Sequence, residues 1–360
     1  MNFNNTLKKY NIIVDKELNK LFEDEIKKTK DEFLKACYSY LKEFTLRPGK
    51  RMRPIAAIMA YKSINDSDEE KIYPLAITPE LFHASSLIHD DIMDEDSLRR
   101  NKPAMHKLFE SYFKKNFTDK KYKGPLFDSF SKRFSVSMAI IQGNILYSLS
   151  NYCVIKSKLD GNLKNKSLKI FNDAYQKINE GQSFDLMLSF RKELSEEDYI
   201  AAAMNKTASL LSASIMFGAV LNNAKPYQLE NLEKYANSIA LAFQLHDDIM
   251  DLSEKMNKGR VHGTDLRKGN STLIIIKALQ NSNESQKKFL SKVLGNNKAT
   301  ESEIKGCISV IKDTGALDYV QKYANKKIME AKKYLNKSDL NEQGYKFFND
   351  FADYIVMRSD

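Results

Sequence analysis

Two identical hexapeptides, His-Asp-Asp-Ile-Met-Asp, contain the residues of this chain whose types and spacing best suit chemistry. The first runs from His89 to Asp94 and the second from His246 to Asp251. Each follows an apolar stretch with helical spacing, and residues four apart on a helix share one face. The first and last of the three aspartates in each copy should therefore point the same way.

Clustered carboxylates repel one another unless a cation lies among them. Magnesium fits such a cluster, because it is commonly held by one or two carboxylates together with substrate phosphates. One such cluster could equally be a solvated helix end. Two identical copies, each preceded by an apolar helix, instead favour a site for a metal ion and a phosphate group.

Basic residues that suit phosphate recognition accompany both copies. Arg99 and Arg100 follow the first copy, and the planar guanidinium group can bind two phosphate oxygens at once. Upstream, residues 48–54 place three cations in a turn that leads into a helix. Residues 257–271 follow the second copy and hold three glycines among basic residues, a pattern found in phosphate-binding loops and in solvated loops alike. Any one of these basic residues, taken alone, could simply be an exposed charge on the protein surface, as most arginines and lysines are.

Helical periodicity recurs along almost the whole chain and predicts the elements that must position these residues. The expected helices span residues 15–44, 54–63, 79–98, 134–157, 168–190, 198–221 and 227–252, with several more towards the end. No alternating strand pattern competes, and only 13 glycines and 7 prolines interrupt 360 residues. The sequence predicts a single all-α domain over residues 1–360, with a lysine-rich surface insertion at residues 114–133.

The composition argues against several other classes of protein. The net charge of +10 comes mostly from scattered lysines without aromatic-interleaved basic repeats, so nucleic-acid binding is not expected. The three cysteines lie far apart and form no CxxC unit, which argues against a disulfide framework and a thiolate zinc site. No apolar run approaches the roughly 20 residues of a membrane span. We expect a cytoplasmic protein without a transmembrane segment.

The ordered motifs resemble the trans-prenyltransferase family, the farnesyl and geranylgeranyl diphosphate synthases. The resemblance covers about residues 48–270 and includes the basic turn and both aspartate motifs. The remaining matching blocks are Gly181-Gln182 with Asp185, Lys206-Thr207, and Phe243-Gln244-Leu245 directly before the second motif. The resemblance implies the isoprenoid synthase fold, a large helical bundle around a central cavity, and a homodimer.

The resemblance also implies a role for each matched residue. Three magnesium ions on the allylic diphosphate would be held by Asp90, Asp94 and Asp247, supported by Asp91, Asp248 and Asp251. The same substrate would contact Arg99, Lys206 and Gln244, and oxygens of Thr207 and Gln244 could face the allylic cation. Isopentenyl diphosphate would be held by Lys50, Arg53, His83 and Arg100.

Three positions depart from the family pattern. The family usually has a lysine five residues after the loop aspartate, which is Asp265 here. Asn270 occupies that position in this chain, and Lys268 lies two residues earlier. Either Lys268 takes over this substrate contact or the contact is lost. Arg260 stands where a lysine is common and keeps the charge, and Pro48 replaces the usual first glycine of the basic turn.

The implied reaction extends dimethylallyl, geranyl or farnesyl diphosphate with isopentenyl diphosphate. The allylic carbon–oxygen bond breaks, the isopentenyl double bond attacks the cation, and a proton is lost. Product length should depend on residues one and two turns before Asp90, which are Ser86, Ser85 and Phe82. No aromatic side chain stands at 85 or 86, and Phe82 lies about one turn deeper. The prediction is therefore a twenty-carbon geranylgeranyl product, with a farnesyl or twenty-five-carbon product as the alternative.

Two further classes remain as alternatives. A terpene cyclase also uses a DDxxD motif on a helical fold, but its second metal motif needs Ser or Thr followed by Glu. Asp251 and Lys255 occupy those positions here, which disfavours cyclisation. A non-catalytic synthase subunit would be expected to have eroded aspartates, whereas both motifs are intact.

Overall fold

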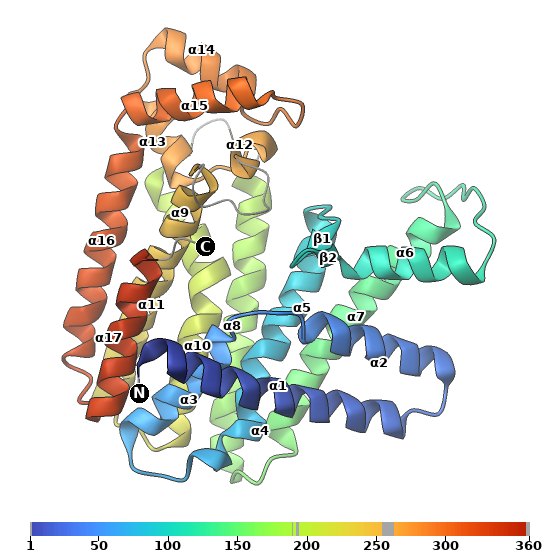
Figure 1. The fold of residues 1–360 in the computed structure, drawn as a ribbon, viewed down its shortest axis with the longest axis vertical. Coiled ribbons are helices and arrows are strands. Elements are labelled where there is room, and N and C mark those ends of the chain that lie inside the picture. Colours follow the sequence, from blue (N-terminus) through green and yellow to red (C-terminus); the bar gives the residue numbers. More distant parts are fainter. Residues whose placement is uncertain (1, 189, 192–193, 254–262, 358–360) are drawn as a thin grey trace. The chain divides into compact units, whose positions relative to one another are not determined.

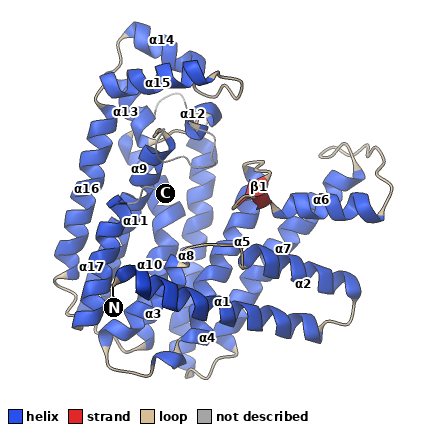
Figure 2. Cartoon of the chain, in the orientation of Figure 1, coloured by secondary structure: helices blue, strands red, loops and turns tan. Residues whose placement is uncertain are grey.

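The computed structural model describes residues 2–188, 190–191, 194–253 and 263–357, and most of these residues are helical (Figures 1 and 2). The all-α prediction is confirmed. One element was not expected from the sequence: strands β1 (Leu98–Arg99) and β2 (Lys102–Pro103) form a short antiparallel hairpin.

The chain divides into two compact units. The N-terminal unit comprises residues 1–171 and 217–222, and the C-terminal unit comprises residues 172–216 and 223–360. The first aspartate motif belongs to the N-terminal unit and the second to the C-terminal unit. That the whole chain acts as one domain stays a prediction.

The N-terminal unit is built from helices that precede and follow the first motif. They are α1 (Phe3–Lys28), α2 (Glu32–Thr45), α3 (Met52–Ile64), the short 3-10 helix η1 (Glu69–Lys71), α4 (Tyr73–Ala76), α5 (Thr78–Met93), α6 (Met105–Asn116), α7 (Phe130–Ile155) and the first part of α8 (Gly161–Leu188). The single helix predicted over residues 15–44 is wrong. Residues 29–31 separate α1 from α2, because the Asp31 carboxylate caps a new helix by accepting a hydrogen bond from the Leu34 amide.

Helix α5 carries the first motif and packs along α7 (Figure 1). A Cβ atom on Gly143 of α7 would lie 2.2 Å from His89 Nε2, so glycine leaves room for the His89 ring in its present position. The predicted continuation of α5 to residue 98 is wrong, because the helix ends at Met93. Glu95 then adopts a left-handed conformation with φ of 54°, and the chain turns into the β1–β2 hairpin.

The C-terminal unit contains the rest of α8 and the helices that follow it. They are α9 (Glu196–Ala203), the π-helix η2 (Met204–Ala208), α10 (Ser209–Leu221) as far as residue 216, α11 (Pro226–Asp251), α12 (Thr264–Lys268), α13 (Leu273–Asn281), α14 (Glu284–Val293), α15 (Glu301–Asp313), α16 (Ala316–Leu335) and α17 (Glu342–Met357). Helix α11, which carries the second motif, packs along α16, and α17 contacts both (Figure 1).

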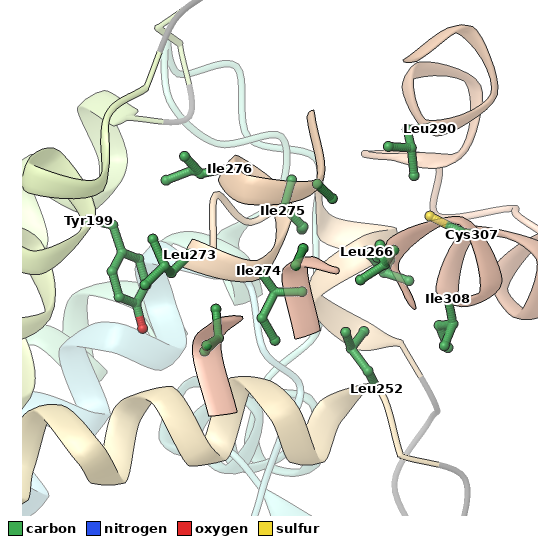
Figure 3. Packing of buried hydrophobic residues seen from close by; sticks show 14 of the residues in the cluster. Tyr199, Leu252, Leu266, Leu273, Ile274, Ile275, Ile276, Leu290, Cys307 and Ile308 are labelled. Carbon is green, nitrogen blue, oxygen red and sulfur yellow. The ribbon is translucent and has the colours of Figure 1, made fainter. Parts of the chain in front are cut away.

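A buried apolar cluster lies beside the end of α11 in this unit (Figure 3). Leu252 follows the second motif and packs in the cluster with Leu266 of α12 and Leu273 and Ile274 of α13. Tyr199 of α9 belongs to the same cluster. This packing fixes the end of the motif helix against α9, α12 and α13.

The helical stretch Glu196–Leu221, which joins α9, η2 and α10, is long and apolar enough to cross a membrane by composition alone. However, 56% of its most apolar window is buried inside the protein, as is common for a core helix. The stretch is therefore weak evidence for a membrane span.

Candidate active site

The three aspartates of the first motif lie in different environments at the end of α5. Asp91 is fully buried, whereas Asp90 is half-buried and Asp94 is exposed. Arg99 Nε donates a hydrogen bond of 2.6 Å to Asp91 Oδ1, and the Arg99 Nη2 group donates to the same oxygen. The Nη2 atom also lies 3.6 Å from carboxylate oxygens of both Asp90 and Asp96. The guanidinium group of Arg99 therefore compensates a cluster of acids.

This compensation is incomplete. Burial raises the pKa of Asp91 to about 6, although the Arg99 hydrogen bond opposes the rise. Its Oδ2 atom is buried and accepts no hydrogen bond from any residue that the structure describes. A buried carboxylate with a raised pKa and an unsatisfied oxygen would be stabilised by a nearby cation.

The β1–β2 hairpin separates the two arginines that follow the motif. Its two-residue turn consists of Arg100 and Asn101, with φ of 54° and 59°, as in hairpin turns that match the twist of the strands. Arg100 Nη1 donates to the Arg47 carbonyl at 3.0 Å, while its Nη2 lies 3.7 Å from the Glu80 carboxylate. Arg99 thus contacts the aspartates, whereas Arg100 contacts the basic turn.

Gly49 in the basic turn allows this approach of Arg100. A Cβ atom there would lie 2.9–3.1 Å from the Arg100 guanidinium atoms. Lys50 beside it is exposed, and Arg53 on the first turn of α3 is half-buried. The structure therefore brings the basic turn and Arg100 together.

Arg51, one of the three cations of the basic turn, and Glu80 have no individual role in the family resemblance. Arg51 is buried in a left-handed conformation with φ of 47°, which is unusual for a residue other than glycine. Its guanidinium group donates to Asp15 at 2.8 Å, to Glu80 at 2.6 Å and to the Arg47 carbonyl at 3.0 Å. Glu80 is also buried, so it supplies the negative charge that lets Arg51 and Arg100 lie close together. A glutamate on an otherwise apolar helix face was the available sequence signal.

His83, one turn after Glu80 on α5, faces this cationic group. Burial, followed by the charges of Arg53 and Arg100, holds the pKa of His83 well below its ordinary value. The imidazole is therefore neutral at physiological pH. The neutral ring can form a hydrogen bond with a phosphate group without adding positive charge to the site.

The second motif shows the same pattern with different partners. Its middle aspartate, Asp248, is buried, and the Tyr199 hydroxyl donates a hydrogen bond of 2.7 Å to Asp248 Oδ2. Gln244 Nε2 donates to the other carboxylate oxygen at 2.9 Å. Burial and the nearby Asp265 raise the pKa of Asp248 well above its ordinary value, and these two hydrogen bonds oppose the rise. No sequence motif marks Tyr199, so its contact with Asp248 was not predicted.

The hydrogen-bond chain continues from Asp248 to Thr207. Because the Gln244 amide nitrogen faces Asp248, its Oε1 atom faces Thr207 and accepts the Thr207 hydroxyl proton at 2.8 Å. A threonine hydroxyl has one proton, so the remaining capacity of this oxygen is as an acceptor. Thr207 lines a cavity of about 170 Å³ together with Lys206, Gln244 and Asp265.

Lys206 and Thr207 lie on the π-helix η2, a helix type that often occurs at functional sites. Lys206 Nζ contacts the Asp185 carboxylate of α8 at 2.7 Å. A Cβ atom on Gly181 would lie 2.5 Å from the Lys206 backbone nitrogen, so this close approach of α8 to η2 requires glycine. These blocks of the predicted site are thus neighbours in the structure.

The third aspartate of the second motif, Asp251, contacts helix α12. Its carboxylate oxygens accept hydrogen bonds from the Thr264 amide at 3.2 Å and the Asp265 amide at 3.0 Å. Asn270 Nδ2 in turn donates to Asp265 Oδ1 at 2.8 Å. Burial and the nearby Asp251 raise the pKa of Asp265 to about 6, while Asn270 and the charge of the exposed Lys268 oppose the rise.

Three residues predicted to control product length lie on α5. Phe82 is fully buried and stacks on Phe171 with a centroid separation of 5.1 Å, and Tyr147 lies edge-on at 5.5 Å. The buried Ser85 hydroxyl donates to the Gly143 carbonyl of α7 at 2.8 Å. Ser86 is half-buried and donates to the carbonyl of His83 in its own helix. Ser86 and Phe82 therefore share a helix face with Asp90, and Ser85 faces α7.

The donor set fits magnesium, although the protein alone does not form a complete ion cage. No group of three or more His, Cys, Asp or Glu side chains within the described residues is placed to hold an ion. Magnesium typically takes one or two carboxylates and completes its shell with water and phosphate oxygens. The unsatisfied Asp91 oxygen and the raised pKa of Asp265 are consistent with such a cation. Arg260 lies outside the described residues.

Known proteins are similar to this chain in both fold and sequence. The geranylgeranyl pyrophosphate synthetase of Pyrococcus horikoshii Ot3 superposes with a TM-score of 0.84 at 25% identity, covering 99% of this chain and 100% of that one. The short chain isoprenyl diphosphate synthase of Methanocaldococcus jannaschii is 33% identical over 302 residues, 84% of each chain. The geranylgeranyl diphosphate synthase of Methanosarcina mazei is 30% identical over 312 residues, 86% of each chain.

These likenesses first define the class, an all-α protein with the isoprenoid synthase fold. Residues 32–311 match the polyprenyl synthetase family. The chain belongs to this family. The predicted fold class and the resemblance drawn from the motifs are therefore confirmed.

The hydrogen bond from Tyr199 to Asp248 can be tested by substitution. Tyr199→Phe removes one of the two donors to a buried carboxylate, which weakens the orientation of Gln244 and Thr207. We expect kcat for chain elongation to fall by about tenfold to a hundredfold and the free energy of unfolding by about 1–3 kcal/mol. Steady-state kinetics and denaturant unfolding measure the two effects.

Tyr235→Phe is the matched control in the same unit. Tyr235 is fully buried, and its hydroxyl donates to the Phe348 carbonyl at 2.6 Å, away from the residues that line the cavity. This variant should lose similar stability and keep the wild-type kcat. An equal loss of kcat in both variants would mean that the Tyr199 effect is only one of stability.

Proposed function

We propose that this polyprenyl synthetase is a trans-prenyltransferase that condenses isopentenyl diphosphate with an allylic diphosphate. The allylic substrate is dimethylallyl, geranyl or farnesyl diphosphate. The observation that carries the proposal is the repeated aspartate motif. In each copy the middle aspartate is buried and bound by donors from the protein itself, by Arg99 at Asp91 and by Tyr199 at Asp248. The names of the related synthases support the same reaction class.

The allylic diphosphate is assigned to the aspartate motifs. Asp90, Asp94 and Asp247 would hold the three magnesium ions that accompany this diphosphate, and Asp91, Asp248 and Asp251 would support them. When bound, magnesium supplies positive charge that stabilises the leaving diphosphate. Arg99 and Lys206 contribute further positive charge, held ready by Asp91 and Asp185 respectively.

Isopentenyl diphosphate is assigned to the basic turn. Lys50, Arg53 and Arg100 bind its diphosphate as cations, and neutral His83 completes the set as a hydrogen-bonding group. Glu80 prevents mutual repulsion of Arg51 and Arg100, which would otherwise push these side chains apart. Arg260, which lies outside the described residues, and Lys268 are assigned to substrate binding, and Lys268 takes over the contact of the lysine absent at 270.

The allylic cation forms in a site where the side chains offer acceptors. Thr207 presents lone pairs because its proton is used in the bond to Gln244, so its oxygen lowers the energy of a nearby positive charge. The proton lost after condensation passes to the departing diphosphate, since no other base is evident among the matched blocks.

The proposal extends to the length of the product. Phe82 is proposed as the residue that limits the length of the growing chain. Its ring packs against Phe171 and Tyr147, and these contacts hold it in position. Phe82 lies about one helical turn, or roughly 6 Å, beyond Ser86. This extra depth favours a twenty-carbon geranylgeranyl product over a fifteen-carbon farnesyl product.

The protein is further proposed to be a cytoplasmic homodimer. Helix α7 exposes a stripe of large apolar side chains that the N-terminal unit leaves uncovered: Ile140, Ile141, Tyr152 and Ile155, each 44–51% exposed. Burial of such a stripe against a second copy would remove apolar surface from water.

Product analysis of the wild-type enzyme tests the proposed reaction. Incubation with isopentenyl diphosphate, magnesium and each allylic primer in turn should give geranylgeranyl diphosphate as the main product by chromatography. Turnover of farnesyl diphosphate without isopentenyl diphosphate would instead indicate a cyclase. Inactivity with every primer would indicate a non-catalytic subunit and contradict the proposal.

Two substitutions on α5 test the chain-length assignment in opposite directions. Phe82→Ala should lengthen the main product by one or two isoprene units, whereas Ser86→Phe should shorten it to farnesyl diphosphate. We choose Ser86 over Ser85 because a large side chain at Ser85 would collide with the α7 backbone. Chromatography of the dephosphorylated products gives the chain length.

The control for the truncation is Phe109→Ala. Phe109 is also fully buried in the N-terminal unit, but it packs on α6 against Tyr40 and Phe134. Both alanine variants should lose about 3–5 kcal/mol of stability. An unchanged product in Phe82→Ala, or an equal change in Phe109→Ala, would show that Phe82 does not set the product length.

A further inference from the structure

The segment between α6 and α7 has a composition that the proposed reaction does not explain. We call residues 114–133 the basic tip, because they lie at the end of the helical pair that α6 and α7 form (Figure 1). Its first residues complete α6 and its last residues begin α7, so only residues 117–129 form the loop. The basic residues of the tip are Lys114, Lys115, Lys120, Lys121, Lys123, Lys132 and Arg133, against only two acids, Asp119 and Asp128.

Both acids are engaged inside the tip. Asp119 accepts hydrogen bonds from the backbone and hydroxyl of Ser131, and Asp128 pairs with Lys132 at 2.7 Å. Within the part of the chain that the structure describes, Lys115, Lys120, Lys121 and Lys123 form no ion pair, and all four are exposed. The tip therefore presents a concentrated positive charge to its surroundings.

Large apolar side chains are exposed among these lysines. Leu126 is 83% exposed, Phe117 is 55% exposed and Phe130 is 39% exposed. Isolated exposed apolar residues are common on protein surfaces, but three within the basic tip are a specific combination. Water solvates the lysines well and the apolar side chains poorly, so a partner should offer both negative charge and an apolar phase.

The tip is ordered by its own contacts. The Tyr122 amide donates to the Asp128 carbonyl at 2.8 Å, and the Phe130 amide donates to the Lys120 carbonyl at 3.2 Å. The rings of Tyr122 and Phe130 lie 5.0 Å apart, and Arg133 lies over the Tyr122 ring at 4.8 Å. Binding through this loop would therefore require little additional ordering of the chain.

We propose that the basic tip docks on the surface of an anionic lipid bilayer. Lysines near such a surface are attracted by its negative potential, while Leu126 and Phe117 can enter the boundary between headgroups and acyl chains. Lysine side chains suit this position, because their apolar stems can lie along the interface with the ammonium group in water. Duplex nucleic acid would match the charge but would leave the exposed leucine and phenylalanines without an apolar environment.

The docking is independent of product length and of the assignment of any active-site residue. Docking would place the enzyme next to the lipid bilayer, into which a long isoprenoid product partitions. Its failure would leave the proposed reaction untouched, because the tip contributes no residue to the candidate active site.

Flotation of the full-length protein with lipid vesicles tests the proposal. Vesicles made from equal parts of phosphatidylcholine and phosphatidylserine should bind the protein at low salt, and binding should weaken as salt rises. Vesicles of phosphatidylcholine alone should bind it much less. No binding to the anionic vesicles would overturn the proposal.

Variants locate the binding on the tip. The triple variant Lys120→Glu, Lys121→Glu, Lys123→Glu should lower the vesicle partition coefficient at least about a hundredfold, since each lysine contributes about fivefold near an anionic surface. Leu126→Ser should lower the vesicle partition coefficient roughly tenfold, because it removes an apolar contact with the bilayer and leaves the charge of the tip unchanged. Both variants should keep the wild-type elongation activity in solution, which shows that they fold.

The matched control carries the same charge change elsewhere. Lys322, Lys326 and Lys333 are exposed lysines on α16, and their triple reversal to glutamate should leave vesicle binding within about twofold of wild type. An equal loss in this control would mean that net charge alone drives binding and would overturn the proposal. If the tip reversal changed the oligomeric state on gel filtration, the tip would be an interface between copies instead.

Discussion

The burial of one carboxylate in each aspartate motif is the constraint on which the candidate active site depends. A buried carboxylate is costly unless donors or cations compensate it. The two copies of the same hexapeptide meet this need differently. The β1–β2 hairpin brings Arg99 to Asp91, whereas α9 and α11 supply Tyr199 and Gln244 to Asp248. Identical motifs therefore acquire unequal surroundings, one strongly cationic and one formed by neutral donors.

The same requirement extends to the residues around each motif. In the N-terminal unit, buried Glu80 allows Arg51 and Arg100 to lie close together, which holds the basic turn beside α5. In the C-terminal unit, Asp251 is bound by the first amides of α12. In each unit, acidic side chains thus fix neighbouring groups of the candidate site in position, and the apolar cluster that contains Leu252 and Leu273 packs at the end of the second motif.

The sequence alone was sufficient for the all-α class, most helices and the family, because these depend on local periodicity and on ordered motifs. It did not predict the break at residues 29–31 or the β1–β2 hairpin, because an aspartate cap and a turn of two left-handed residues interrupt a still favourable helical composition. Tyr199 and Glu80 were missed because their importance comes from partners distant in sequence, Asp248 and Arg51. Only tertiary structure brings those pairs together.

The central claim is that the two aspartate motifs bind magnesium jointly with diphosphate, and thermal unfolding tests it most directly. Magnesium and inorganic diphosphate together should raise the Tm of the wild-type protein by more than the sum of their separate effects, because each completes the binding site of the other. The double variant Asp90→Asn, Asp247→Asn should lose this joint increase. A joint increase that persists in this variant, or none in the wild type, would contradict the account.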